Sequence, residues 1–130
     1  MNKYIINKSS SDEQLYNLSK QFNIPNLIIC RLKDVPKYLK NKNIDNMIIN
    51  LDNFNYGTHW VGLSKSKKIY FDSYAQDKPN EIPKNYKLAS STKQLQSITG
   101  EDCGWLTVLW LYYINFKTNE EYYNLFKDCY

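Results

Sequence analysis

The spacing of hydrophobic and polar positions changes several times along the chain, and each change predicts an element. Ser10 and Glu13 have capping-box spacing, which predicts a helix that begins near Ser10. The segment at residues 24–26 contains a proline and an asparagine and is expected to end that helix. Between these limits, apolar residues recur at helical spacing at Leu15, Leu18 and Phe22.

Runs rich in apolar and β-branched residues follow, and they predict strands. The expected strands are residues 26–32, 46–51, 58–64 and 68–73, with a short one at 86–88. One helical turn is expected at residues 35–39, and the polar stretch at 65–67 suits a hairpin turn. Residues 47–51 are so apolar that they indicate a central strand covered on both faces. Residues 76–85 contain two prolines and are expected to form a loop.

The pattern changes again at Cys103. Residues 103–114 are apolar almost all round, and a helix of that kind is normally buried at the centre of a domain. Thr118 and Glu121 repeat the capping-box spacing and predict a last helix that continues to Phe126. The elements together predict an α+β fold, in which a small mixed sheet of four or five strands is flanked by helices.

The composition is that of a folded protein. Hydrophobic residues make up 42% of the chain and aromatic residues 15%, which excludes a disordered class. A length of 130 residues fits one domain, residues 1–130. No apolar run is long enough to span a bilayer, and the N-terminus lacks the apolar stretch of a signal peptide. We therefore expect a soluble, intracellular monomer without a membrane partner.

The cysteines and the charge exclude several kinds of site. Cys30, Cys103 and Cys129 have the spacing of neither a disulfide framework nor a zinc site, and the chain has one histidine. We expect reduced thiols, no metal and no cofactor. The net charge of +4 comes from lysines that form no dense cluster, so the charge supports at most a weak association with DNA.

Cys103 stands where a thiol can act as a nucleophile. It opens the apolar helix, and the unpaired N–H groups and dipole of a helix N-terminus favour a thiolate. Gly104 follows it and leaves room for the backbone of a substrate, while the N–H of Cys103 can point at a developing oxyanion. The alternative interpretation is a small buried side chain on a buried helix.

Three further residues are candidate catalytic residues only if Cys103 is the nucleophile. His59 is the sole histidine, so a Cys–His enzyme must use it as the base. Asp72 ends the next predicted strand, and a hairpin would bring its carboxylate to the second imidazole N–H. The amide of Gln96, or less favourably that of Gln94, can complete an oxyanion hole. The ordinary alternatives are a core histidine, a turn-forming aspartate and a surface glutamine.

The order His, Asp, Gln, Cys resembles the adenovirus maturation proteases, or adenains, and the related SUMO and ubiquitin-like-protein proteases. The resemblance covers residues 10–115 and is stronger for the small versions encoded by virophages and Polinton-like elements. It implies a circularly permuted papain-like core, because in papain the cysteine comes first. It also implies the roles of base, acidic partner, oxyanion donor and nucleophile for His59, Asp72, Gln96 and Cys103. The matching motifs are Gly57-Thr58-His59-Trp60 and Asp102-Cys103-Gly104.

The resemblance implies a cysteine endopeptidase of virion maturation. Such an enzyme cleaves capsid and core precursor proteins at Gly-containing sites, in the virion and the host cytoplasm, and an activating peptide is left open. One alternative is a protease that removes ubiquitin or SUMO-like modifiers from their Gly-Gly tails, and another is an inactive capsid-associated relative. Trp60 is expected either to shield the catalytic pair from water or to pack in the core. Cys30 and Cys129 are expected to be structural or incidental.

Overall fold

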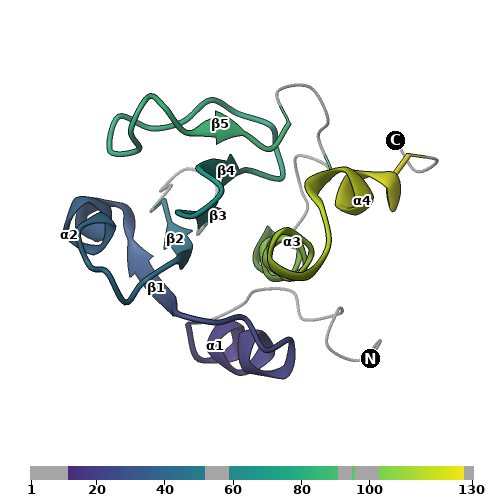
Figure 1. Cartoon of the computed structure of the whole chain (residues 1–130), viewed down its shortest axis with the longest axis horizontal. Helices are drawn as coiled ribbons and strands as arrows, with labels where there is room; N and C mark the ends of the chain where they lie inside the picture. The colour runs from purple at the N-terminus through teal and green to yellow at the C-terminus, as the bar shows by residue number, and fades with distance from the viewer. Residues whose placement is uncertain (1–11, 52–58, 91–94, 96–102, 128–130) are drawn as a thin grey trace.

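Within the described part of the chain, helices lie on both sides of one five-stranded sheet (Figure 1). The computed structural model describes residues 12–51, 59–90, 95 and 103–127. The helices are α1 (Asp12–Gln21), η2 (Leu32–Asp34), α2 (Val35–Leu39), α3 (Cys103–Phe116) and α4 (Asn119–Asn124). The strands are β1 (Leu27–Arg31), β2 (Asn46–Asn50), β3 (Trp60–Ser64), β4 (Ile69–Phe71) and β5 (Lys87–Leu88). No helix in these ranges is long and apolar enough to cross a membrane.

The strands follow one another across the sheet in the order β1-β2-β3-β4-β5. The pairs β1–β2 and β4–β5 are parallel, and β2–β3 and β3–β4 are antiparallel. The predicted α+β class, with a mixed sheet between helices, is confirmed at this level. The prediction that residues 47–51 belong to a central strand covered on both faces is confirmed for β2, which lies between β1 and β3 and is buried along nearly its whole length. Strong apolar character is typical of a strand that is covered on both faces.

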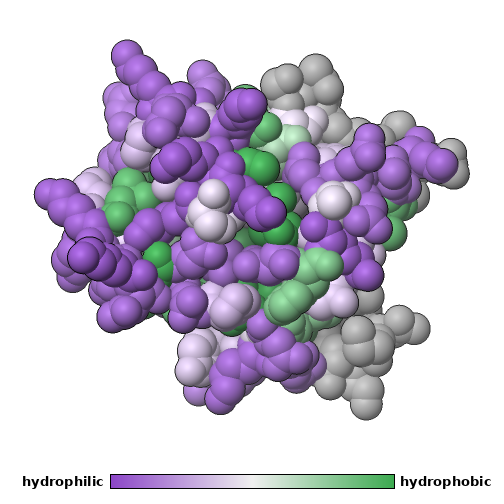
Figure 2. Space-filling view, in the orientation of Figure 1, coloured by the Kyte–Doolittle hydropathy of each residue, from purple (hydrophilic) through white to green (hydrophobic). Residues whose placement is uncertain are grey.

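Both faces of the sheet are covered, because successive side chains of a strand point to opposite sides. Helices α1, α3 and α4 cover the face to which Ile48, Trp60 and Phe71 contribute. Helix α2 and the connection before β5 cover the other face. The buried residues there are Cys30, Val35, Met47, Ile49, Val61, Leu63, Tyr70, Ile82 and Tyr86. Hydrophilic side chains dominate the molecular surface that Figure 2 shows, with hydrophobic ones visible in its middle.

Helix α3 packs directly on β3, as expected for a helix that is apolar almost all round. Val108, Trp110 and Leu111 are fully buried, whereas Phe116 at the end of the helix is exposed. The close approach depends on Gly62. A Cβ atom at that position would lie 2.9 Å from Thr107 Cγ2, which is closer than real side chains pack. The glycine therefore lets the helix that begins with Cys103 lie against the strand that follows His59.

The observed ends of the strands and helices can be compared with the predicted ones. Strand β4 is shorter than the predicted 68–73, because Lys68 has a positive φ of 57° and a turn begins at Asp72. The predicted cap of the last helix is confirmed, since Thr118 Oγ1 accepts the N–H of Glu121 at 3.0 Å. That helix ends at Asn124 and not at 126, and turns follow it. The predicted cap at Ser10 lies outside the described residues.

Candidate active site

The register of the β3–β4 hairpin brings His59 and Asp72 together. The ladder pairs Ser64 with Ile69 and ends with Gly62 opposite Phe71. Continued past its end, this register sets Tyr74 opposite His59, with the side chain of Asp72 on the same face of the sheet. In the structure, His59 Nε2 lies 2.8 Å from Asp72 Oδ1. The contact expected from the sequence is therefore present.

A tight turn fixes the carboxylate of Asp72. The Oδ1 atom also accepts the backbone N–H of Tyr74 at 2.8 Å, and the carbonyl oxygen of Asp72 accepts the N–H of Ala75 at 2.8 Å. Ala75 has a φ of 58°, a value that L residues rarely adopt, and it closes the turn. Asp72 is only 4% exposed, so its carboxylate is presented to the imidazole and not to solvent.

Tyr74 is a neighbour of the site that the sequence analysis did not single out. Its ring lies beside the imidazole of His59, with 4.8 Å between the ring centroids and 39° between the ring planes. Burial, followed by the negative charges of Cys103 and Asp72, raises the pKa of the Tyr74 hydroxyl. Its position two residues after Asp72 in a hairpin is the signal that could have identified it, because side chains two apart share a face.

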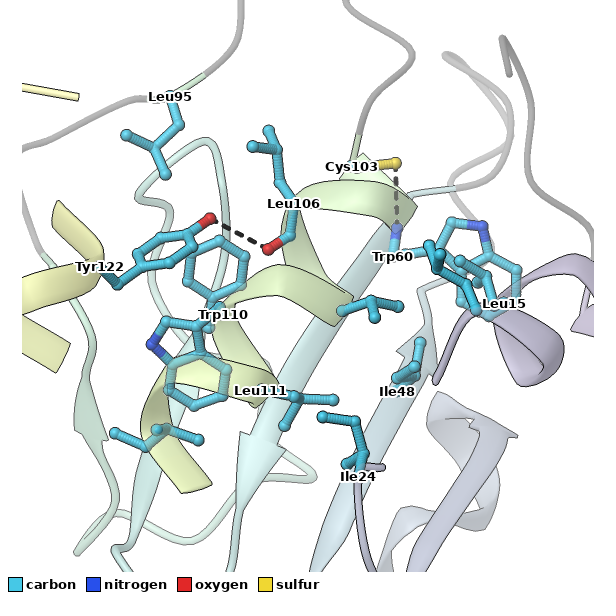
Figure 3. Packing of buried hydrophobic residues seen from close by; sticks show 14 residues of the cluster. Leu15, Ile24, Ile48, Trp60, Leu95, Cys103, Leu106, Trp110, Leu111 and Tyr122 are labelled. Carbon is cyan, nitrogen blue, oxygen red and sulfur yellow. Dashed lines mark hydrogen bonds between the residues drawn. The ribbon is translucent and has the colours of Figure 1, made fainter. Parts of the chain in front are cut away.

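Cys103 begins α3, as expected, and its side chain is 7% exposed. The backbone N–H of Trp60 points at its sulfur, with 3.5 Å between Trp60 N and Cys103 Sγ (Figure 3). A donor at that position favours the charged form of the sulfur, as does the N-terminus of a 14-residue helix. The thiol therefore has two nearby sources of stabilisation for a thiolate besides any charge on His59.

The imidazole of His59 connects the carboxylate to the thiol. Burial alone would lower its pKa, but hydrogen bonds to Asp72 and Cys103, and the charges of those two groups, raise the pKa of His59 to about 9. Since Nε2 faces Asp72, the nitrogen that remains for Cys103 is Nδ1. Carboxylate, imidazole and thiol thus lie next to one another, an arrangement that can form a thiolate and move its proton.

Trp60 contributes to the site through its backbone. Its indole is 3% exposed and belongs to the same core cluster as Leu15, Ile48 and Cys103 (Figure 3). Of the two interpretations offered by the sequence, core packing describes the side chain. The group that reaches the sulfur is the main-chain N–H, which no sequence pattern distinguishes.

The remaining residues considered in the sequence analysis lie either on the far side of the sheet or outside the described residues. Cys30 is buried on the α2 side of the sheet with Val35 and Met47. Burial, and then the charge of Asp34, raises the pKa of its thiol to about 12, as suits a structural cysteine. Gln94, Gln96 and Cys129 lie outside the described residues, and their expected roles stay predictions.

Comparison with known proteins adds no relative to this picture. No protein-family model matches the chain, and a search of curated proteins finds no match either. The chemistry of the site therefore has to be judged from the residues that form it.

Proposed function

We propose that the protein is a cysteine endopeptidase with Cys103 as nucleophile and His59 as general base and acid. The observation that carries the proposal is the position of the buried His59 ring, which is hydrogen-bonded to Asp72 and close enough to Cys103 for the thiol to raise its pKa. In this proposal the fold is a circularly permuted papain-like core. The helix N-terminus at Cys103 and the sheet that carries His59 and Asp72 support that assignment.

The proposed reaction begins with an ion pair. A His59 pKa of about 9 keeps the imidazole protonated near neutral pH, and its charge stabilises a thiolate on Cys103. The thiolate attacks the scissile carbonyl, and His59 delivers its proton to the leaving amine. An acyl-enzyme remains on the sulfur. The neutral imidazole then takes a proton from water as the water attacks the acyl carbon, and returns that proton to the sulfur when the product acid leaves.

The other residues hold this pair and the charge that develops. Asp72 accepts the Nε2–H of His59, which fixes the orientation of the ring and stabilises the imidazolium. The N–H of Cys103 and the side chain of Gln96 are the proposed oxyanion donors. Tyr74, half-buried beside the imidazole, occupies space next to the reacting atoms. The proposed preference for glycine at the cleavage site rests on the resemblance to the adenain-like proteases.

We propose viral capsid and core precursors as the substrates, cut at Gly-containing sites during virion maturation in the virion and the host cytoplasm. This part of the proposal rests on the order His59, Asp72, Gln96, Cys103 and on the motifs around it. Proteases that release ubiquitin or SUMO-like modifiers act on Gly-Gly tails with the same chemistry, so the substrate experiment has to separate the two classes.

The experiment compares the unmodified chain with Cys103→Ala, His59→Ala and, as control, Ser19→Ala, which removes a buried hydroxyl from α1. Each is incubated with a peptide taken from a capsid precursor with a Gly-containing site and with a ubiquitin-like fusion. We expect cleavage of the peptide by the unmodified chain and the control only. Unchanged hydrolysis in Cys103→Ala would refute the proposed nucleophile. Cleavage of the fusion alone would move the substrate to the modifier class, and no cleavage of either by the unmodified chain would support an inactive relative.

A further inference from the structure

The backbone of Trp60 lies beyond the end of one ladder and is bound by α3. The β3–β4 ladder ends at Gly62, two residues after Trp60. The N–H of Leu51 on the β2 side goes to the carbonyl oxygen of His59, so strand alternation turns the N–H and C=O of Trp60 away from β2. Both groups meet α3. The N–H donates to Cys103 Sγ at 3.5 Å, and the carbonyl oxygen accepts from Thr107 Oγ1 at 3.3 Å.

Thr107 therefore contacts both the first turn of α3, which carries Cys103, and strand β3, which follows His59. Its hydroxyl also lies 2.7 Å from the carbonyl oxygen of Cys103, and a hydroxyl has one proton to share between the two acceptors. The side chain is fully buried. Its Cγ2 would lie 2.9 Å from a Cβ on Gly62, so the methyl group packs on β3 two residues after Trp60.

A second buried hydroxyl shows what is particular to Thr107. Ser19 Oγ donates to Leu15 O at 2.7 Å, the same bond across one helical turn, and Ser19 is 1% exposed. That bond stays within α1. Bonds from a hydroxyl to the carbonyl four residues earlier are ordinary in helices. The contact of Thr107 with Trp60, and its place one turn after Cys103, are what link it to the site.

We propose that Thr107 is a positioning residue of the catalytic pair, an inference that rests on the proposed function. Its hydroxyl ties the first turn of α3 to β3, so that the sulfur of Cys103 stays on the N–H of Trp60 and against the ring of His59. Without the hydroxyl, the carbonyl of Trp60 loses this donor, and the strand end can move away from the helix. The thiolate then loses an N–H donor, and the sulfur loses its alignment with the imidazole.

The test uses Thr107→Val, which keeps the shape but removes the hydroxyl, Thr107→Ser, which keeps the hydroxyl, and Ser19→Ala as matched control. Alkylation of Cys103 by iodoacetamide is followed across pH by mass spectrometry of the Cys103 peptide, together with kcat/KM on the cleaved peptide. In Thr107→Val we expect the pH of half-maximal alkylation to rise by about 0.7 and kcat/KM to fall about tenfold. Thr107→Ser should stay within about twofold of the unmodified chain. Ser19→Ala should lower the melting temperature without moving the pH profile.

An unchanged alkylation profile and unchanged kcat/KM in Thr107→Val would overturn the inference, whatever the melting temperature. If Thr107→Val does not fold by circular dichroism, Thr107→Ala removes the same hydroxyl with less crowding, and its profile decides in the same way. Alkylation reports the thiolate without any need for hydrolysis. A shifted profile in a chain that cleaves no peptide would therefore refute the proposed function and keep the positioning role.

Discussion

Replacing Asp72 by asparagine tests how the site keeps its histidine charged. Asparagine preserves the size of the side chain and an oxygen for the N–H of Tyr74, so the turn at Asp72 should persist. It removes the negative charge that lies 2.8 Å from His59 Nε2. The chain has one histidine, so a sample without an affinity tag gives a single imidazole signal that needs no assignment.

The magnitude follows from what holds the pKa of His59 at about 9. Burial is the largest influence and lowers the pKa, while Asp72 provides the larger of the two hydrogen bonds and the larger of the two charge effects that raise it above 6.5. Asp72 is thus the main group that raises the pKa of His59. A nearby opposite charge shifts a pKa by about 1–3 units, so the loss of the Asp72 charge should lower the pKa of His59 by at least about one unit, or about 1.4 kcal/mol.

The assay is an NMR titration of the imidazole Hε1 proton of His59 in the unmodified chain and in Asp72→Asn. Asp77→Asn is the matched control, since Asp77 is an exposed carboxylate on the same connection and its side chain binds the N–H of Lys78. We expect midpoints near 9 for the unmodified chain and the control, and a midpoint at least about one unit lower for Asp72→Asn. A midpoint near 6.5 in the unmodified chain, or the same midpoint in Asp72→Asn, would refute the reasoning.

Three further changes test the fold and the site. Because the pKa of His59 is higher in the folded than in the unfolded chain, its protonation contributes about 3 kcal/mol to stability, complete below pH 6.5 and lost as the pH rises through about 9. In urea unfolding, His59→Ala should therefore lose more stability at pH 6 than at pH 10, where only the packing and hydrogen bond of the neutral ring are missing, and an equal loss at both would contradict the raised pKa. Gly62→Ala should cost about 1–3 kcal/mol in urea unfolding, because its Cβ would press on Thr107, and equal stability would contradict the packing. Thr118→Ala should lose about 1 kcal/mol by removing the cap of α4 without changing peptidase activity, and a loss of activity at full stability would contradict a purely local role.

Much of the site could be predicted from the sequence because it depends on local patterns. Two apolar strands joined by a short polar turn fix a hairpin, and the hairpin brings His59 to Asp72. An abrupt change to an apolar run placed Cys103 at the start of a helix. In both cases the residues that determine the hairpin or the helix start lie within a short stretch of sequence. The spacing of apolar residues therefore predicts each one directly.

The rest depends on how distant elements approach one another. The order of the strands, with β3 in the middle, depends on the parallel crossover from β1 to β2, which no local pattern shows. The contact of Thr107 with the carbonyl of Trp60 exists because Gly62 lets α3 approach β3 closely. The N–H of Trp60 meets the sulfur of Cys103 only where β3 extends past β4. These contacts join residues that are far apart in the sequence, so no repeating pattern of apolar and polar residues predicts them.

The rate of Cys103 alkylation at pH 6, compared between the unmodified chain and His59→Ala, tests the central claim most directly. An ordinary thiol of pKa 8.5 is only about 0.3% ionised at that pH, so a thiolate held by an imidazolium should react on the order of a hundredfold faster. The measurement follows the Cys103 peptide by mass spectrometry after brief exposure to iodoacetamide, with folding checked by circular dichroism. The account predicts rapid alkylation of the unmodified chain and loss of that rate in His59→Ala. Equal, slow alkylation of both would contradict it.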